Sequence, residues 1–264
     1  GFKEVIFSIS GEDVYGNLKG TGKGKTVLLY THVQSQYQKK NFVQIQEIGD
    51  CTSFMMAHCI DTLKAVEISV LKQMEQFISL TATEFGYGGS RVQIGGGRIG
   101  GDGSIGAWIA EFINQYGSLD RGKYGDVDLT KYLGTRAREW GQNGPPKSLF
   151  PIAKKHVIKT VSQVRNYEAA RDAIVNGYPV GVCSNQGFGS VRDKNGMLKP
   201  SGNWAHAMAV LAVDDAFSIP SVLIQNSWPY SWVSGPQRYG NEPPSSFWCS
   251  ADVFDKMLKQ NDSF

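Results

Sequence analysis

The spacing of apolar residues changes near the middle of this chain, and this change constrains the fold. In the first half, apolar side chains recur at three- and four-residue steps, which is typical of helices. After a further helical segment at 166–176, three short apolar runs read as strands: Val180–Ser184, Ala207–Val213 and Ser221–Gln225. We therefore expect an α+β fold of two lobes, a helical lobe followed by an antiparallel β lobe.

Capping residues and glycines predict where the helices begin and end. A helix is expected to start at Cys51, with the carboxylate of Asp50 accepting from free amides of its first turn. Ser104 is expected to cap a second helix that ends near Gly117. Between these two helices, the glycine-dense segment 86–106 predicts a loop.

The same signals divide the chain into three parts. Residues 1–40 are predicted to form an N-terminal extension that packs on the β lobe, with strands at 4–9 and 26–32. Residues 41–140 are predicted to form the helical lobe with Cys51, and 141–264 the β-rich lobe with His206 and Asn226. The Gly- and Pro-rich segment 141–151 is the expected crossing between lobes.

Size and charge exclude several classes of protein. With 264 residues the chain can bury a full core. Its net charge of +3 is too small to indicate nucleic-acid binding. We find no apolar run near the roughly 18 residues that a membrane-spanning helix needs, and no signal peptide follows Gly1. The expected partners therefore include neither nucleic acid nor membrane, and the cellular location stays open.

The cysteine pattern does not indicate a metal site. None of the four cysteines forms a Cys-x-x-Cys pair, so we expect no metal and no cofactor. His58 and Cys59 are adjacent on the first helix, which suits packing behind Cys51 better than metal binding. A disulfide between Cys183 and Cys249 is neither required nor excluded by the sequence.

A cysteine, a histidine and an asparagine in distinctive settings suggest covalent acyl transfer. Cys51 at a helix N-terminus would have its thiolate stabilised by the helix dipole and by a nearby histidinium. His206, between the small residues Ala205 and Ala207, would take the thiol proton, and Asn226 would orient the imidazole. Each residue also has an ordinary interpretation, as a buried cysteine, a core histidine or a turn asparagine.

Two further side chains have expected roles beside these three residues. The amide of Gln46, five residues before Cys51, could donate to a developing oxyanion together with the Cys51 backbone N–H. Gln44 is a weaker candidate for that role. Trp228 could shield the hydrogen bond between histidine and asparagine from water.

Four motifs in this order resemble the papain-like cysteine peptidases: the glutamine before the cysteine, the helix and strand of residues 169–182, the histidine flanked by small residues, and Asn226-Ser227-Trp228. The resemblance covers roughly residues 44–232 and implies a two-lobe fold with the cysteine on the helical lobe. It also implies that Gly103 and Ser104 pair with the substrate backbone, with Ala205 and Trp228 beside it. Thr52 and Ile48 depart from the family pattern. The segment from Gln46 to Cys51 looks most similar to members encoded by bacteriophages.

The sequence therefore favours a thiol peptidase acting on a peptide or protein substrate. Two alternatives remain open. One is a non-catalytic structural or decoration protein of a virion that retains the fold and binds other virion proteins. The other is a different acyl transfer on the same three residues, such as amidase or transglutaminase chemistry.

Overall fold

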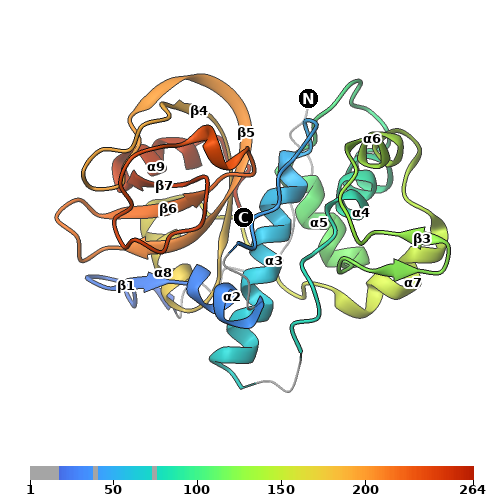
Figure 1. The fold of residues 1–264 in the computed structure, drawn as a ribbon, viewed down its shortest axis with the longest axis horizontal. Helices are drawn as coiled ribbons and strands as arrows, with labels where there is room; N and C mark the ends of the chain where they lie inside the picture. The colour runs from blue at the N-terminus through green and yellow to red at the C-terminus, as the bar shows by residue number, and fades with distance from the viewer. Residues whose placement is uncertain (1–17, 38–40, 73–75) are drawn as a thin grey trace.

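The computed structural model of the chain describes residues 18–37, 41–72 and 76–264, and these residues form two lobes with α3 (Cys51–Ser69) between them. In Figure 1 the sheet lies on one side of α3, and the helices of residues 83–153 lie on the other. This is the predicted α+β architecture. The strand predicted at 4–9 lies outside the described residues.

The β lobe is built on one antiparallel sheet. Its longest strand, β5 (Pro200–Asp214), pairs along one edge with β6 (Ser221–Gln225), which in turn pairs with β7 (Ser246–Ser250). Along its other edge β5 pairs first with β4 (Val180–Phe188) and then with β1 (Thr26–Leu28). The lobe also contains α8 (Tyr167–Val175), α9 (Ala251–Leu258) and a 3-10 turn at Tyr230–Trp232.

The helical lobe consists of short helices packed around α3. Its helices are α4 (Thr83–Gly89), a π-helical turn (Ser90–Ile94), α5 (Gly106–Tyr116), α6 (Gly134–Asn143) and α7 (Phe150–Ala153). It also contains 3-10 turns at Lys147–Leu149 and Lys154–His156 and a small hairpin of β2 (Lys123–Tyr124) and β3 (Val127–Asp128).

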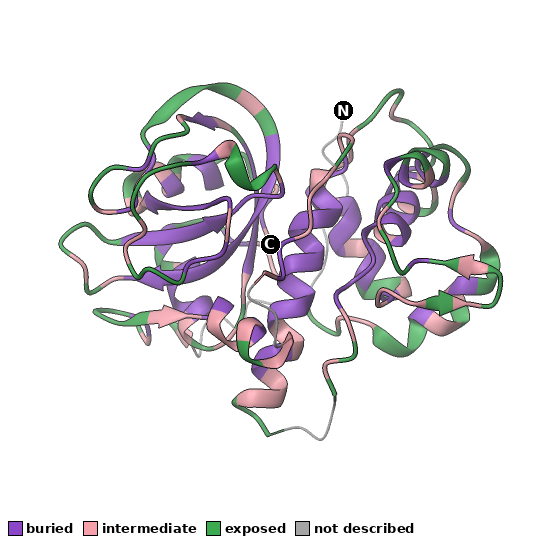
Figure 2. Ribbon diagram, in the orientation of Figure 1, coloured by how far each residue is buried: buried purple, intermediate pink, exposed green. Residues whose placement is uncertain are grey.

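The packing of α3 against both lobes makes it the central element of the core. Of its 19 residues 13 are buried, so the helix is covered around most of its circumference. Figure 2 shows this burial along α3 and across the sheet beside it. Met55 of α3 belongs to the same hydrophobic cluster as Ile109 of α5 and Ala209 of β5. Cys51 therefore begins the helix on which the two lobes meet.

Glycine-rich and N-terminal segments differ from their predictions. The strand predicted at 26–32 ends at Leu28, because Tyr30–Tyr37 forms helix α2. The predicted loop at 86–106 begins with the helical segments Thr83–Gly89 and Ser90–Ile94. In this segment glycine allows two helices to pack closely, because a Cβ on Gly89 would lie 2.0 Å from the ring of Phe112.

The chain also crosses from the helical lobe to the β lobe at a later residue than predicted. Residues 147–153 remain in the helical lobe, and the Ile158 N–H donates to the carbonyl of Ile113 in α5. By Val164 the backbone is bonded instead to Ser263. The crossing predicted at 141–151 therefore occurs after residue 158.

The segment around Asp262 joins the lobes. The two carboxylate oxygens of Asp262 accept hydrogen bonds from the backbone N–H groups of Gly106, at 2.8 Å, and Ala107, at 2.7 Å. Asp262 therefore satisfies free amides of the first turn of α5, the role predicted for Ser104. Two residues later, the Phe264 N–H donates to the Gly181 carbonyl of β4 at 2.9 Å.

Three of the four cysteines and His58 are buried in the core, whereas Cys51 is only partly buried. All four cysteines are free. Cys183 and Cys249 lie in different hydrophobic clusters, so they do not form the disulfide that the sequence neither required nor excluded. His58 is buried within α3, with the ring of Phe42 edge-on at 6.5 Å. Neither ring nitrogen of His58 has a hydrogen-bond partner among the described residues.

This burial predicts acid sensitivity. Desolvation lowers the pKa of His58 to about 4, so the folded protein resists a proton that the unfolded chain accepts near its ordinary pKa of about 6.5. The stability that the neutral His58 contributes is therefore fully present above pH 6.5 and is lost as the pH falls from about 6.5 toward 4. Between pH 7 and 4.5, the wild type should lose roughly 2–3 kcal/mol more unfolding free energy than His58→Leu. Urea titration at both pH values measures this difference, and His156→Leu, which changes an exposed histidine, should behave like wild type.

Candidate active site

Cys51 is the first residue of α3, as predicted, and its side chain faces the β lobe. The backbone N–H of Ala207 in β5 interacts with the thiol and lowers the thiol's pKa. Burial has the larger, opposing effect and raises the pKa of Cys51 to about 11. Burial therefore favours a neutral thiol in the substrate-free protein and opposes the thiolate stabilisation expected at the helix N-terminus.

Asp50 does not cap the helix as predicted. Its side chain makes no hydrogen bond to the first turn of α3 and instead accepts one from the hydroxyl of Tyr132 at 2.8 Å. The ring of Tyr132 packs edge-on against Phe54 at 5.0 Å. Tyr132 had no role in the sequence prediction, because only the folded chain brings residues 50 and 132 together.

His206 and Asn226 lie side by side in the β lobe. The imidazole Nε2 of His206 and the side-chain oxygen of Asn226 are 2.8 Å apart, and both residues are buried. Since an amide oxygen only accepts, Nε2 carries the proton and Nδ1 is the free, basic nitrogen. Burial lowers the pKa of His206, so the ring is neutral near pH 7.

The position of Ala207 relates this pair to the cysteine. His206 directly precedes Ala207, whose backbone amide approaches the Cys51 thiol. The described hydrogen bonds include none between the thiol and the imidazole. The structure thus places a neutral thiol and a neutral, oriented imidazole at one interface between the lobes.

Trp228 covers the ring of His206, as its position in the sequence predicts. The two ring centroids are 4.7 Å apart with an interplanar angle of 31°. Trp228 itself packs edge-on against Trp204, at 4.9 Å, and Trp232, at 5.2 Å. This aromatic group shields the imidazole from water on that side.

The amide of Gln46 is held beside the same pair. Its Nε2 donates to the Ile48 carbonyl at 2.8 Å, and its Oε1 accepts from the hydroxyl of Ser227 at 2.5 Å. One N–H of the side chain is left for another acceptor. Gln44 is instead bonded to Thr81 and Arg121 within the helical lobe, away from the histidine and asparagine.

The glycine-rich segment before α5 is anchored from within its own lobe. The Gly103 N–H donates to the Tyr87 hydroxyl at 3.0 Å, and its carbonyl accepts from the Arg91 guanidinium. Arg91 also donates to the carbonyls of Ile99 and Gly101, each at 2.8 Å. The Gly103 N–H is therefore occupied by Tyr87, and its carbonyl already accepts one hydrogen bond.

Ser104 and Ala205 are the remaining residues predicted to contact the substrate. The Ser104 hydroxyl lies 3.0 Å from that of Ser90, and its backbone N–H and carbonyl have no partner among the described residues. Ala205 is exposed next to His206. Of these two residues, Ser104 is the one whose backbone groups are without a partner among the described residues.

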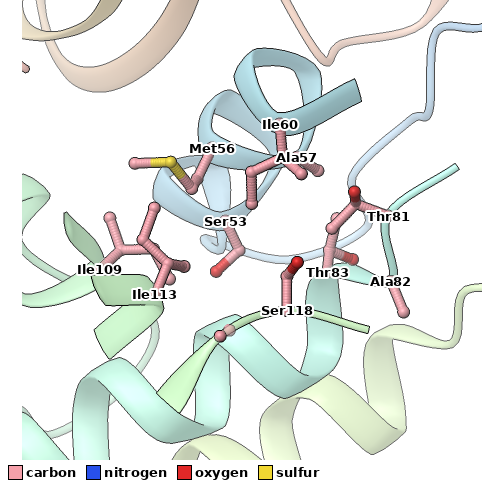
Figure 3. Close-up of a pocket in the computed structure, with 12 residues that line it drawn as sticks. Ser53, Met56, Ala57, Ile60, Thr81, Ala82, Thr83, Ile109, Ile113 and Ser118 are labelled. Carbon is pink, nitrogen blue, oxygen red and sulfur yellow. The ribbon is translucent and has the colours of Figure 1, made fainter. Parts of the chain in front are cut away.

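A cavity in the helical lobe is separate from these residues. It has a volume of about 10 Å³ and is lined by α3, α4 and α5, with Ser53 and Ser118 pointing into it (Figure 3). The Ser53 hydroxyl has no partner among the residues that the structure describes. This space suits one buried water molecule rather than a substrate.

Residues 18–37, 41–72 and 76–264 hold neither a metal-binding cluster nor a membrane-spanning helix. Within these ranges no cluster of three or more His, Cys, Asp or Glu side chains could hold a metal ion. No helix there is both long and apolar enough to cross a membrane.

Removing the amide that holds the imidazole tests this geometry. Asn226→Ala should lower kcat/KM for peptide hydrolysis by about 10- to 100-fold, because the ring stays present but loses its orientation. Steady-state assays measure the change. Asn176→Ala, on the far end of α8, is the matched control and should keep full activity. Equal activity of the two variants would contradict the assigned role.

Comparisons with known proteins agree with this architecture at the level of the fold. No family model and no curated protein sequence matches the chain. Among solved structures, it is similar to xylellain, a cysteine protease from Xylella fastidiosa, with a TM-score of 0.56 and 18% identity over 84% of this chain and 80% of the other. A structure from work on the mite allergens Blo t 1 and Der p 1 gives 0.51 and 13%, over 90% and 68%. Procathepsin B S9 from Trypanosoma congolense gives 0.50 and 10%, over 90% and 75%. The chain therefore has the papain-like two-lobe fold of these proteins.

Proposed function

We propose that this protein is a thiol peptidase that hydrolyses peptide bonds through Cys51, His206 and Asn226. The observation that carries the proposal is the His206 imidazole, which Asn226 fixes through Nε2 at 2.8 Å. His206 lies one residue from Ala207, whose backbone amide lowers the pKa of the Cys51 thiol. A nucleophile, a base and a group that orients the base are the minimum for this chemistry. The papain-like fold and its similarity to a cysteine protease support the same reaction.

Because both groups rest in their neutral forms, the proton moves during attack rather than before it. Nδ1 of His206 takes the thiol proton as the sulfur of Cys51 bonds to the substrate carbonyl carbon. The imidazolium then gives that proton to the leaving amine as the C–N bond breaks, which leaves a thioester on Cys51. Water, deprotonated by His206, hydrolyses the thioester and releases the acid and the free thiol.

The negative charge that develops on the carbonyl oxygen needs donors. The backbone N–H of Cys51 is at the first position of α3, where amides lack partners within the helix. The second N–H of the Gln46 side chain is a further donor for the same oxygen. Ser104 offers backbone groups for the substrate main chain, with Ala205 on the opposite lobe and Trp228 beside the leaving group.

An active-site label and a substrate mixture test the proposal together. A peptide epoxide that alkylates thiol peptidases should inactivate the enzyme with one equivalent bound, and mass spectrometry should find the adduct on Cys51. A mixture of fluorogenic peptides should be cleaved before labelling and not after it. Labelling at Cys51 without cleavage of any peptide or protein substrate would contradict peptidase activity.

The same experiment separates the alternatives. A virion structural protein that retains the fold should cleave no peptide and should assemble with virion proteins equally well as wild type and as Cys51→Ala. An amidase should release amines from cell-wall fragments while leaving peptides intact. No feature of the site favours either alternative over the peptidase, and an origin in a bacteriophage remains a prediction.

A further inference from the structure

The residue before the cysteine has an unusual environment for a carboxyl group. Asp50 is fully buried, with 0% of its surface exposed. Its Oδ2 accepts from Tyr132 at 2.8 Å, whereas its Oδ1 has no partner among the described residues. A buried, ionised carboxylate with an unpaired oxygen is costly, and the cost disappears when the group is protonated.

The elements around Asp50 supply negative rather than positive charge. Glu84 of α4 and Asp102 of the segment before α5 both disfavour its ionisation, and Glu47 lies next to Tyr132. Three nearby arginines are paired with these two carboxylates: Arg121 and Arg136 with Glu84, and Arg138 with Asp102. Burial and these neighbours together raise the pKa of Asp50 to about 7.

Asp50 also acts on the neighbouring thiol. Its negative charge raises the pKa of Cys51, in opposition to the Ala207 amide, which lowers it. The Asp50 carbonyl accepts from the Ser53 N–H at 3.0 Å, so the residue is fixed to the first turn of α3. A change in the charge of Asp50 is therefore felt by the sulfur with little movement of the backbone.

We propose that Asp50, held by Tyr132, is a positioning residue whose protonated form permits ionisation of Cys51 and whose ionised form suppresses it. The proposal deepens the proposed function and rests on it, since Cys51 is the nucleophile there. It makes a carboxyl group that never touches the substrate responsible for reducing the gain in Cys51 reactivity as the pH rises through neutrality.

The rate of Cys51 alkylation by iodoacetamide between pH 5 and 9 tests this directly. In wild type, the logarithm of the rate should rise with pH, flatten near neutrality as Asp50 ionises, and then rise again. In Asp50→Asn the flattening should vanish, and above pH 8 the rate should exceed that of wild type by about three- to tenfold, which corresponds to at most one pKa unit of the thiol. Below pH 6 the two proteins should react alike.

Tyr132→Phe separates this charge effect from a packing effect. The hydroxyl stabilises the ionised carboxylate, so its loss should move the flattening to higher pH instead of removing it. Asp252→Asn removes the same charge from the exposed surface of α9 and should reproduce the wild-type profile. Thermal unfolding of each variant establishes that it is folded.

Profiles of Asp50→Asn and wild type that superimpose at every pH would overturn the proposal, as would a flattening that Tyr132→Phe leaves in place. Alkylation is followed by mass spectrometry of the peptide that contains Cys51, so no substrate is needed. If the charge of Asp50 affects alkylation but the protein cleaves no peptide, the link between Asp50 and Cys51 stands and the peptidase function is rejected. If the protein cleaves peptides but the charge of Asp50 has no effect, the peptidase function stands and the link is rejected.

Discussion

Replacing Cys51 by alanine is expected to lower kcat for peptide hydrolysis by about 10⁴-fold or more, to the level that binding and oxyanion donors alone sustain. The covalent route then has no nucleophile, and the remaining groups act only on water. Initial rates on the best peptide of the fluorogenic mixture, measured at saturating substrate, give this number.

Cys59→Ala is the matched control, because it removes a thiol from the same helix two turns later. Cys59 is buried in the core, so this variant should lose some stability and keep its kcat. Residual activity in Cys51→Ala within tenfold of wild type would show that hydrolysis occurs elsewhere. An equal loss in both variants would instead indicate damage to α3.

Glu84→Ala should lower the free energy of unfolding by about 3–5 kcal/mol, which is the cost of leaving a buried charge without its partner. The carboxylate is fully buried and pairs with Arg121 at 2.6 Å and Arg136 at 3.5 Å. It also accepts from the Leu133 N–H at 3.2 Å, next to Tyr132. Urea-induced unfolding, followed by circular dichroism, measures the change.

A surface ion pair in the same lobe provides the comparison. Lys123 and Asp128 lie 3.5 Å apart with side chains that are 72% and 49% exposed. Lys123→Ala should therefore change stability by no more than about 1 kcal/mol. Similar losses in Glu84→Ala and Lys123→Ala would contradict the importance assigned to burial.

The architecture could be predicted from the sequence wherever a long apolar pattern was present. The helix starting at Cys51 and the strands near residues 180, 207 and 221 follow directly from periodicity. The glycine-rich segment was misinterpreted, since the same residue type suits a turn and a close contact between helices. Only the folded chain reveals that Gly89 faces the ring of Phe112.

The histidine and asparagine could be predicted as a pair because neighbouring antiparallel strands bring them together, and their hydrogen bond bears out that inference. Details that depend on distant residues could not be predicted. Asp50 follows the usual capping pattern, yet the hydroxyl of Tyr132 competes for its carboxylate. Gly103 similarly uses its backbone groups on Tyr87 and Arg91, which no local pattern reveals.

The position of Asp262 has a consequence for biosynthesis. Its carboxylate supplies the acceptors for the first amides of α5, although 156 residues separate Asp262 from Gly106. While the ribosome is still translating the β lobe, the helical lobe lacks this anchor, and the interlobe surface of α3 has no sheet to cover it. The nascent helical lobe is thus expected to need protection by chaperones until the residues near position 262 emerge.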